Sequence, residues 1–152
     1  MTEERGFSLR PYRPADEDHA ITLWQRTWQA AYPEIDFAGR VDWWRRRWRD
    51  ELVPGAAVVV AEAAGAMIGF VTIDPRSLYL DQIVVAPEYW GSGAAVALVD
   101  AAKGVSPHGL DLDVNTDNAR AMRFYKKCGF VISGTGKNPQ SGRPVYRMRW
   151  RP

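Results

Sequence analysis

The apolar residues of this chain recur with two different periods, which predicts helices interleaved with strands. Residues 7–12 alternate as a short strand. Two helical patterns follow. The first starts within the proline and acids of residues 13–18 and ends before Pro33, and the second runs from a cap at Asp36 to Pro54 and Gly55. The apolar stripes are Ala20, Ile21, Trp24, Trp28, Ala31 and Tyr32 in the first helix, and Phe37, Val41, Trp44, Trp48 and Leu52 in the second.

The middle of the chain predicts three successive strands and a buried helix. Residues 56–74 hold two β-branched runs that turn near Ala64 and Gly65, which indicates a hairpin, and residues 77–86 form the third strand. Residues 94–103 are apolar nearly all round, as expected for a helix packed on a sheet, and Gly104 ends them. A strand with clean alternation follows at residues 109–115.

The C-terminal third predicts one more helix and two strands. Residues 116–130 offer Thr116 or Asp117 as a cap and Gly129 as a terminator. The last two strands flank a polar loop at residues 134–143. The predicted order is therefore β-α-α-β-β-β-α-β-α-β-β, an α/β (α+β) chain. Neither a repeat nor a linker divides it, so one domain over residues 1–152 is expected.

Composition constrains the expected partners and location of the protein more than its activity. Hydrophobic residues make up 46% and charged residues 25%, which are ordinary values for a folded soluble protein. The net charge of +2 gives no field that would favour nucleic acid or an anionic membrane, so neither partner is expected. A single cysteine, Cys128, excludes an internal disulfide, and neither a signal pattern nor a long apolar run is present. The expected location is cytoplasmic.

The stretch WWRRRWRD at residues 43–50 is the one segment that suggests nucleic acid or a membrane. Acidic residues lie one helical turn from its arginines. A solvated, ion-paired face over a tryptophan core is therefore the preferred interpretation. The acids in question are Asp42, Asp50 and Glu51, beside Arg46 and Arg47.

The run GSGAA at residues 91–95 carries the clearest sign of chemistry. It follows a predicted strand and opens a predicted helix, so several backbone N–H groups point out of a helix N-terminus. The helix dipole favours an anion there, and the missing side chains at Gly91 and Gly93 would admit a pyrophosphate. A tight turn without a ligand remains the alternative. Neither the nucleotide-triphosphate loop nor the dinucleotide fingerprint is present.

Two spaced motifs resemble the GNAT family, the Gcn5-related N-acetyltransferases. VAPEYWGSGAA (residues 85–95) is similar to the family's coenzyme A loop, with Trp90 standing where the family usually has Arg or Gln. The resemblance covers nearly the whole chain and implies a mixed central sheet of six or seven strands with about four helices. The second motif matches at Asn118, Ala121, Phe124, Tyr125, Gly129 and Phe130.

The resemblance also implies how the site would work. Acetyl-CoA would serve as cosubstrate without a metal, and an amine would attack its thioester directly. The backbone amide of Val85 would face the developing oxyanion, and Tyr125 would protonate the leaving thiolate. Lys126 or Lys127 would assist the loop. The implied coenzyme-binding residues are Ile83, Val84, Val85, Gly91, Ser92, Gly93, Ala94, Ala95, Asn118 and Tyr125.

The general base and the acceptor are less constrained by the sequence. Simple strand alternation places Asp81 and Tyr79 on the same face as Ile83 and Val85, which makes Asp81 the candidate base, and a water relay would serve equally well. Cys128 lies on an apolar stripe and is interpreted as a core residue. The acceptor site is expected between the first two helices, the start of the strand that contains Asp81 and the 134–143 loop, with Trp24, Trp28, Tyr32 and Glu34 as candidates.

Three functions from different classes follow. The leading hypothesis is an N-acetyltransferase acting on a primary amine of a small molecule, amino acid or peptide. The alternative is a non-catalytic acyl-CoA-binding module, prompted by Trp90 and the uncertain base. An adaptor for nucleic acid or membrane comes third. Many members of the family form dimers, so the resemblance is also consistent with a homodimer.

Overall fold

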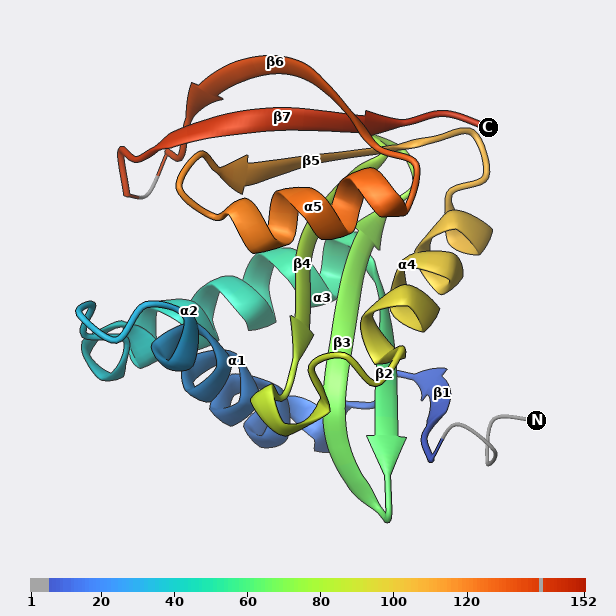
Figure 1. Ribbon diagram of the computed structural model, residues 1–152. Helices are drawn as coiled ribbons and strands as arrows, with labels where there is room; N and C mark the ends of the chain where they lie inside the picture. The colour runs from blue at the N-terminus through green and yellow to red at the C-terminus, as the bar shows by residue number, and fades with distance from the viewer. Residues whose placement is uncertain (1–5, 140) are drawn as a thin grey trace.

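The computed structural model describes residues 6–139 and 141–152 and is built on one seven-stranded sheet (Figure 1). The strand order is β1-β2-β3-β4-β5-β7-β6. All neighbours pair antiparallel except β4 and β5, which are parallel, so the sheet is mixed as expected. The predicted absence of a signal segment rests on residues 1–10, of which residues 1–5 lie outside the described residues, as does Gln140 of the predicted loop.

The elements follow the order that the sequence pattern predicts. The strands are β1 (Ser8–Pro11), β2 (Ala57–Ala63), β3 (Ala66–Asp74), β4 (Tyr79–Val85), β5 (Leu110–Asn115), β6 (Val131–Lys137) and β7 (Pro144–Trp150). The helices are α1 (Glu17–Ala31), α2 (Val41–Arg47), α3 (Val53–Gly55), α4 (Ala94–Val105) and α5 (Ala119–Lys127). The three-residue α3 continues α2 through one wide turn at Trp48–Leu52, and ends at Gly55 as predicted.

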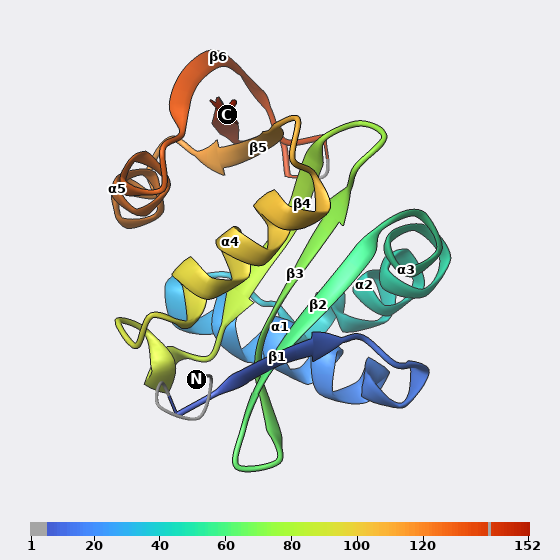
Figure 2. The same ribbon diagram turned by 90° about the vertical axis from the view of Figure 1, so that its right-hand side faces the viewer.

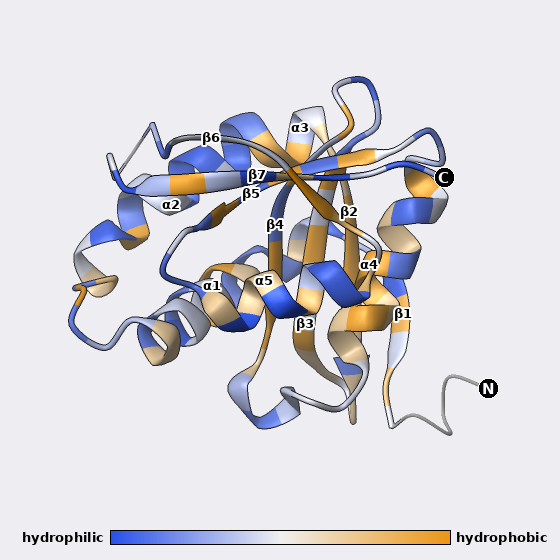
Figure 3. Ribbon diagram, turned by 45° about the horizontal axis from the view of Figure 1, so that its top comes forward, coloured by the Kyte–Doolittle hydropathy of each residue, from blue (hydrophilic) through white to orange (hydrophobic). Residues whose placement is uncertain are grey.

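Helices cover both faces of the sheet (Figure 2). On one side α1 and α2 enclose a core rich in aromatic rings, in which Trp24 stacks on Trp44 with ring centroids 4.6 Å apart. On the other side α4 and α5 pack over a second core that includes Leu98, Leu112 and Tyr125. Figure 3 shows the apolar residues concentrated along β2, β3 and β4, with hydrophilic residues on the outer surfaces of the helices. Burial of these two apolar layers stabilises the arrangement.

The sheet opens between its two parallel strands. Six residue pairs join β3 to β4, whereas β4 and β5 meet at the single pair Tyr79 and Asp111. The register of β3 against β4 shifts between Leu80 and Gln82, which leaves Asp81 as an extra residue, a β-bulge. A bulge bends its strand and increases the local twist. The two strands therefore diverge beyond this point, as Figures 1 and 2 show.

A few predicted boundaries were wrong. The cap of α5 is Asn118, whose side chain accepts a hydrogen bond from the backbone N–H of Ala121, and not Thr116 or Asp117. Strand β6 extends to Lys137, which shortens the predicted loop. Helix α4 continues one residue beyond Gly104. Within the described residues, none of the helices has the length and apolar character needed to span a bilayer.

Candidate active site

The backbone of β4 presents unpaired groups to the opening in the sheet. The N–H of Ala86 donates to the carbonyl of Ile68, and that of Gln82 to the hydroxyl of Thr72, so the even-numbered residues face β3. In an antiparallel ladder the intervening residues point the opposite way. Ile83 and Val85 therefore direct their N–H and C=O groups to the side that β5 has left, where, among the described residues, only the Val85 carbonyl has a partner, the indole N–H of Trp90. A ligand lying in the opening would find the donors and acceptors of a sheet edge.

The loop that opens α4 provides a second set of donors. The backbone N–H groups of Gly91, Gly93, Ala95 and Val96 have no hydrogen-bond partner within residues 6–139 and 141–152. Gly91 and Gly93 adopt φ values of +83° and +91°, and a Cβ built on either meets nothing within 4 Å. The loop thus combines free amides, a helix N-terminus and open space, which fits a pyrophosphate group.

Trp90 fixes the start of this loop. Its indole N–H donates to the carbonyl oxygen of Val85 at 2.8 Å, which ties the loop to the end of β4. The guanidinium of Arg120, from α5, lies over the indole ring at 4.1 Å from its centroid. Trp90 therefore contacts both the end of β4 and helix α5. Sequence reasoning missed Arg120, because nothing in the local pattern indicates a contact across 30 residues.

Tyr125 is a residue of α5, and its side chain points into the core, in the same cluster as Val85 and Ala94. Its side chain is 8% exposed, and its hydroxyl makes no hydrogen bond to the described part of the chain. Burial holds the pKa of Tyr125 above its usual range, because the phenolate would be desolvated. The phenol is therefore protonated at neutral pH, the state that a general acid requires. Asn118, at the helix start, uses its side-chain oxygen as the cap and keeps its NH₂ group free for another partner.

Asp81 was predicted on the same face of β4 as Ile83 and Val85, and this prediction was wrong. The bulge reverses the alternation, so Leu80 packs in the α4/α5 core with Val85 while Asp81 turns to the face covered by α2. Arg47 binds both carboxylate oxygens of Asp81, at 3.0 and 2.6 Å, and the Gln82 amide donates to one of them at 3.1 Å. These donors occupy much of the carboxylate that a general base would need free.

Tyr79 lies on the same face as Asp81. Its hydroxyl donates to Asp113 of β5 at 3.2 Å. Burial, together with the nearby Asp113 and Asp81 carboxylates, raises the pKa of Tyr79 well above its usual range. This hydrogen bond joins β4 to β5 just before they separate.

A polar cluster connects α1 to the far side of the opening. Asn115, at the end of β5, donates to the Tyr32 hydroxyl at 3.1 Å, and that hydroxyl donates to Asp117 at 3.2 Å. The Arg143 guanidinium lies over the Tyr32 ring and 3.6 Å from the Asp117 carboxylate. Tyr32 was predicted as an acceptor-site residue. The structure adds Asn115, Asp117 and Arg143 around it, contacts that no sequence spacing could indicate.

The other predicted acceptor residues have different surroundings. Trp24 is a core residue between Trp44 and Phe37, whereas Trp28 is half-buried and stacks on Tyr32. Glu34 is exposed. Trp28 therefore extends the cluster through its contact with Tyr32, whereas Trp24 belongs to the core.

The arginine-rich stretch is an ion-paired face, as predicted, although most partners lie elsewhere. Arg47 pairs with Glu51 one turn along, at 3.3 Å, as expected. Arg45 and Arg49 instead bind Glu17 at the start of α1. The stretch thus anchors α2 to α1.

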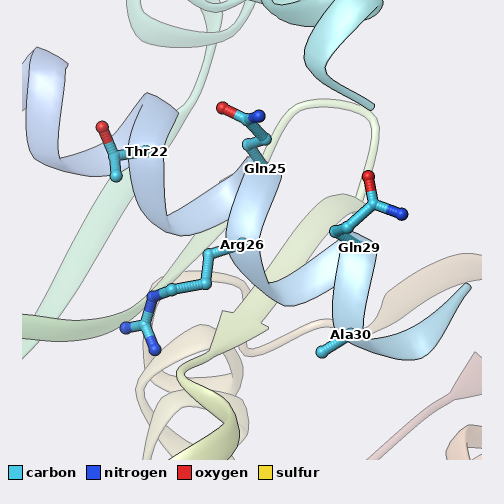
Figure 4. Close-up of a pocket in the computed structure, with 5 residues that line it drawn as sticks. All are labelled: Thr22, Gln25, Arg26, Gln29 and Ala30. Carbon is cyan, nitrogen blue, oxygen red and sulfur yellow. The ribbon is translucent and has the colours of Figure 1, made fainter. Parts of the chain in front are cut away.

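A surface hollow and the single cysteine are two further features of the structure. A surface hollow of about 340 Å³ is lined by α1 alone, and Figure 4 shows polar side chains around it, among them Gln25 and Gln29. Its Arg26 forms an ion pair with Glu88 at 2.7 Å. Cys128 is partly buried against the core, and burial raises the pKa of its thiol. No cluster of metal-ligating side chains occurs among the described residues.

Comparison with known proteins agrees with this geometry. A family model described as acetyltransferase (GNAT) family matches residues 18–130. Peptidyl-lysine N-acetyltransferase YjaB of Salmonella typhimurium is 27% identical over 139 residues, covering 91% of this chain and 92% of that protein. L-amino acid N-acetyltransferase AaaT of Escherichia coli is 35% identical over 145 residues, covering 88% of this chain and 85% of that protein.

Solved structures share the fold. PaiA N-acetyltransferase from Thermoplasma acidophilum, determined in complex with coenzyme A, superposes with a TM-score of 0.77 at 19% identity, covering 96% of this chain and 99% of that one. The apo form of YjaB from Escherichia coli gives a TM-score of 0.76 at 24% identity, covering 95% and 97%. At these identities the likeness shows a common architecture.

Proposed function

The chain belongs to the acetyltransferase (GNAT) family and is an N-acetyltransferase, and from that premise we propose that it transfers acetyl from acetyl-CoA directly to a primary amine. The observation that supports the proposal is the opening between β4 and β5, because backbone groups of β4 and the free amides at the start of α4 would be available to a coenzyme lying there. When bound, acetyl-CoA supplies an activated acyl group and a thiol leaving group.

Each residue of the site has a separate task in this proposal. The amides of Gly91, Gly93, Ala95 and Val96 hold the pyrophosphate, and Ile83 and Val85 hold the pantetheine through their backbone. The Val85 N–H stabilises the oxyanion as the amine attacks. The Tyr125 hydroxyl donates its proton to the sulfur as the thioester bond breaks.

The acceptor enters from the α1/α2 face. Asp113 and Asp117 lie along that side of the opening, and each accepts a hydrogen bond from a tyrosine hydroxyl at 3.2 Å but lies 3.6 Å from its arginine partner. Carboxylates that are loosely paired attract an ammonium group, which suits a protonated amine substrate. Because Arg47 engages Asp81, the amine loses its proton through water in this proposal, the alternative that the sequence left open.

The relatives' names define the acceptors to test first. YjaB is named for peptidyl-lysine and AaaT for L-amino acids, so the panel should hold a lysine peptide, free amino acids and a peptide with a free N-terminus. Free thiol and the acetylated acceptor are both measured. Thiol release that depends on one acceptor class supports the proposal and identifies the class. Coenzyme binding without thiol release for any acceptor would favour the non-catalytic binding module.

A further inference from the structure

The loop before α4 has no cation of its own. Residues 87–96 contain one charged side chain, Glu88, and it is paired with Arg26. Position 90 is a tryptophan, whose indole has no positive charge and whose N–H is committed to the Val85 carbonyl. A diphosphate bound here would meet backbone amides and the helix dipole alone. A charge from another element would strengthen the site considerably.

Helix α5 provides unpaired positive charge on the same side of the sheet as α4 (Figure 2). Its sequence, ARAMRFYKK, contains no acid. Within the described residues, none of its four cations has a carboxylate partner, whereas Arg10, Arg45, Arg47 and Arg49 elsewhere all do. These four cations, all exposed, are Arg120, Arg123, Lys126 and Lys127.

Arg120 is the member of this set that reaches the loop. Its guanidinium stacks over Trp90 at 4.1 Å from the ring centroid, and Trp90 is the residue directly before Gly91. Stacking uses the flat face of a guanidinium and leaves its in-plane N–H groups free to bind phosphate oxygens. The hydrogen bond from Trp90 to Val85 fixes the ring on which Arg120 rests.

We infer that Arg120 is the cation of the coenzyme's diphosphate site and that Trp90 is the residue that positions it. This inference rests on the proposed function, because the anion is that of coenzyme A. Trp90 carries no charge itself, but it positions a positive charge that comes from the neighbouring helix α5.

The test measures binding, not turnover. Titration calorimetry with coenzyme A and with pantetheine, which lacks the phosphates, is performed on the wild type and on Arg120→Gln. Arg40→Gln is the matched control, because Arg40 also stacks on an aromatic ring, Phe37, at 5.4 Å, and lies outside the loop. Thermal melts establish that each variant is folded.

Arg120→Gln should weaken coenzyme A binding about 10-fold or more, the loss expected for a charged hydrogen bond, and leave pantetheine binding unchanged. Arg40→Gln should change neither. Equal coenzyme A affinity in both variants would overturn the inference, and so would an equal loss for pantetheine, since the effect would then not concern phosphate. A wild type that binds no coenzyme A would instead contradict the proposed function.

The positioning role of Trp90 needs a double-mutant cycle. Trp90→Ala should weaken coenzyme A binding, and adding Arg120→Gln to it should cost much less than in the wild type, because the guanidinium has already lost its support. Trp90→Phe retains a ring but loses the hydrogen bond to Val85, so it should preserve more of the Arg120 contribution than Trp90→Ala does. Fully additive losses would show that Trp90 does not act through Arg120.

Discussion

Arg47 of α2 binds both carboxylate oxygens of Asp81, the residue at the β4 bulge, at 3.0 and 2.6 Å. Both side chains are largely buried, at 17% and 18% exposure. The pair therefore joins the helical layer to the strand at the point where the sheet opens. We therefore propose that Asp81 maintains the shape of the opening, in place of the predicted role as general base.

Asp81→Asn should lower stability while retaining catalysis. Loss of the carboxylate leaves Arg47 largely buried with Glu51 as its remaining carboxylate partner, which should reduce the free energy of unfolding by about 1–3 kcal/mol. Turnover should stay within about 10-fold of wild type, measured by thiol release at saturating acceptor. The control Arg47→Gln should destabilise similarly. A drop of about 100-fold or more in turnover, with unchanged stability, would restore Asp81 as the general base.

Tyr125→Phe tests the general acid. The ring that packs against Phe130 is kept, so stability and coenzyme A affinity should barely change. Turnover should fall by about 10²–10⁴, because the leaving thiolate loses its proton donor. Rapid-mixing kinetics with the best acceptor would measure this. Wild-type turnover would assign Tyr125 to packing, and loss of coenzyme binding would make it a binding residue.

The pH dependence of Tyr125 has a definite sign. Its pKa is raised in the folded protein, so its contribution to stability is complete below the ordinary tyrosine value of about 10 and is lost as pH rises beyond that. Denaturant unfolding from pH 8 to 11 should show the wild type losing stability more steeply than Tyr125→Phe above about pH 10. Parallel curves would mean that the hydroxyl is not desolvated.

Gly93→Ala tests the loop, with a second glycine inside α4 as the control. At φ = +91° an alanine should cost about 1–2 kcal/mol of stability, and its methyl group would enter the open space above the amides. Coenzyme A binding should fall at least about 10-fold. Gly104→Ala, at the other end of α4 in ordinary helical backbone, should stabilise by about 0.5–1 kcal/mol and leave binding unchanged. Equal binding by both variants would remove the loop from the site.

Asp16 should govern stability in acid. Arg10 binds both of its carboxylate oxygens at 2.8 Å, and with the Arg13 amide this lowers the pKa of Asp16 from 3.8 to about 2. Its contribution of about 2 kcal/mol should be present above pH 4 and lost as pH falls towards 2. Asp16→Asn should flatten that part of the unfolding profile. The exposed Asp18→Asn is the control, and an identical profile for both would exclude this role.

Local pattern determined most of the architecture of this protein. The apolar periods predicted the order of strands and helices, and the run from Gly91 to Ala95 predicted a helix N-terminus with free amides, because backbone geometry and helix-end amides depend on neighbouring residues. The motif around Tyr125 likewise depends on the spacing within one helix. Such features depend only on residues that are close together in the sequence.

Tertiary structure decided the rest. The bulge at Asp81 arises from how β3 pairs with β4, and it reversed the face that simple alternation assigned to that carboxylate. The pairing of Arg47 with Asp81 joins residues 34 apart in the sequence, and Arg120 reaches Trp90 across 30 positions. A side chain's partner depends on which elements pack together, and packing is a property of the whole core that no short stretch of sequence contains.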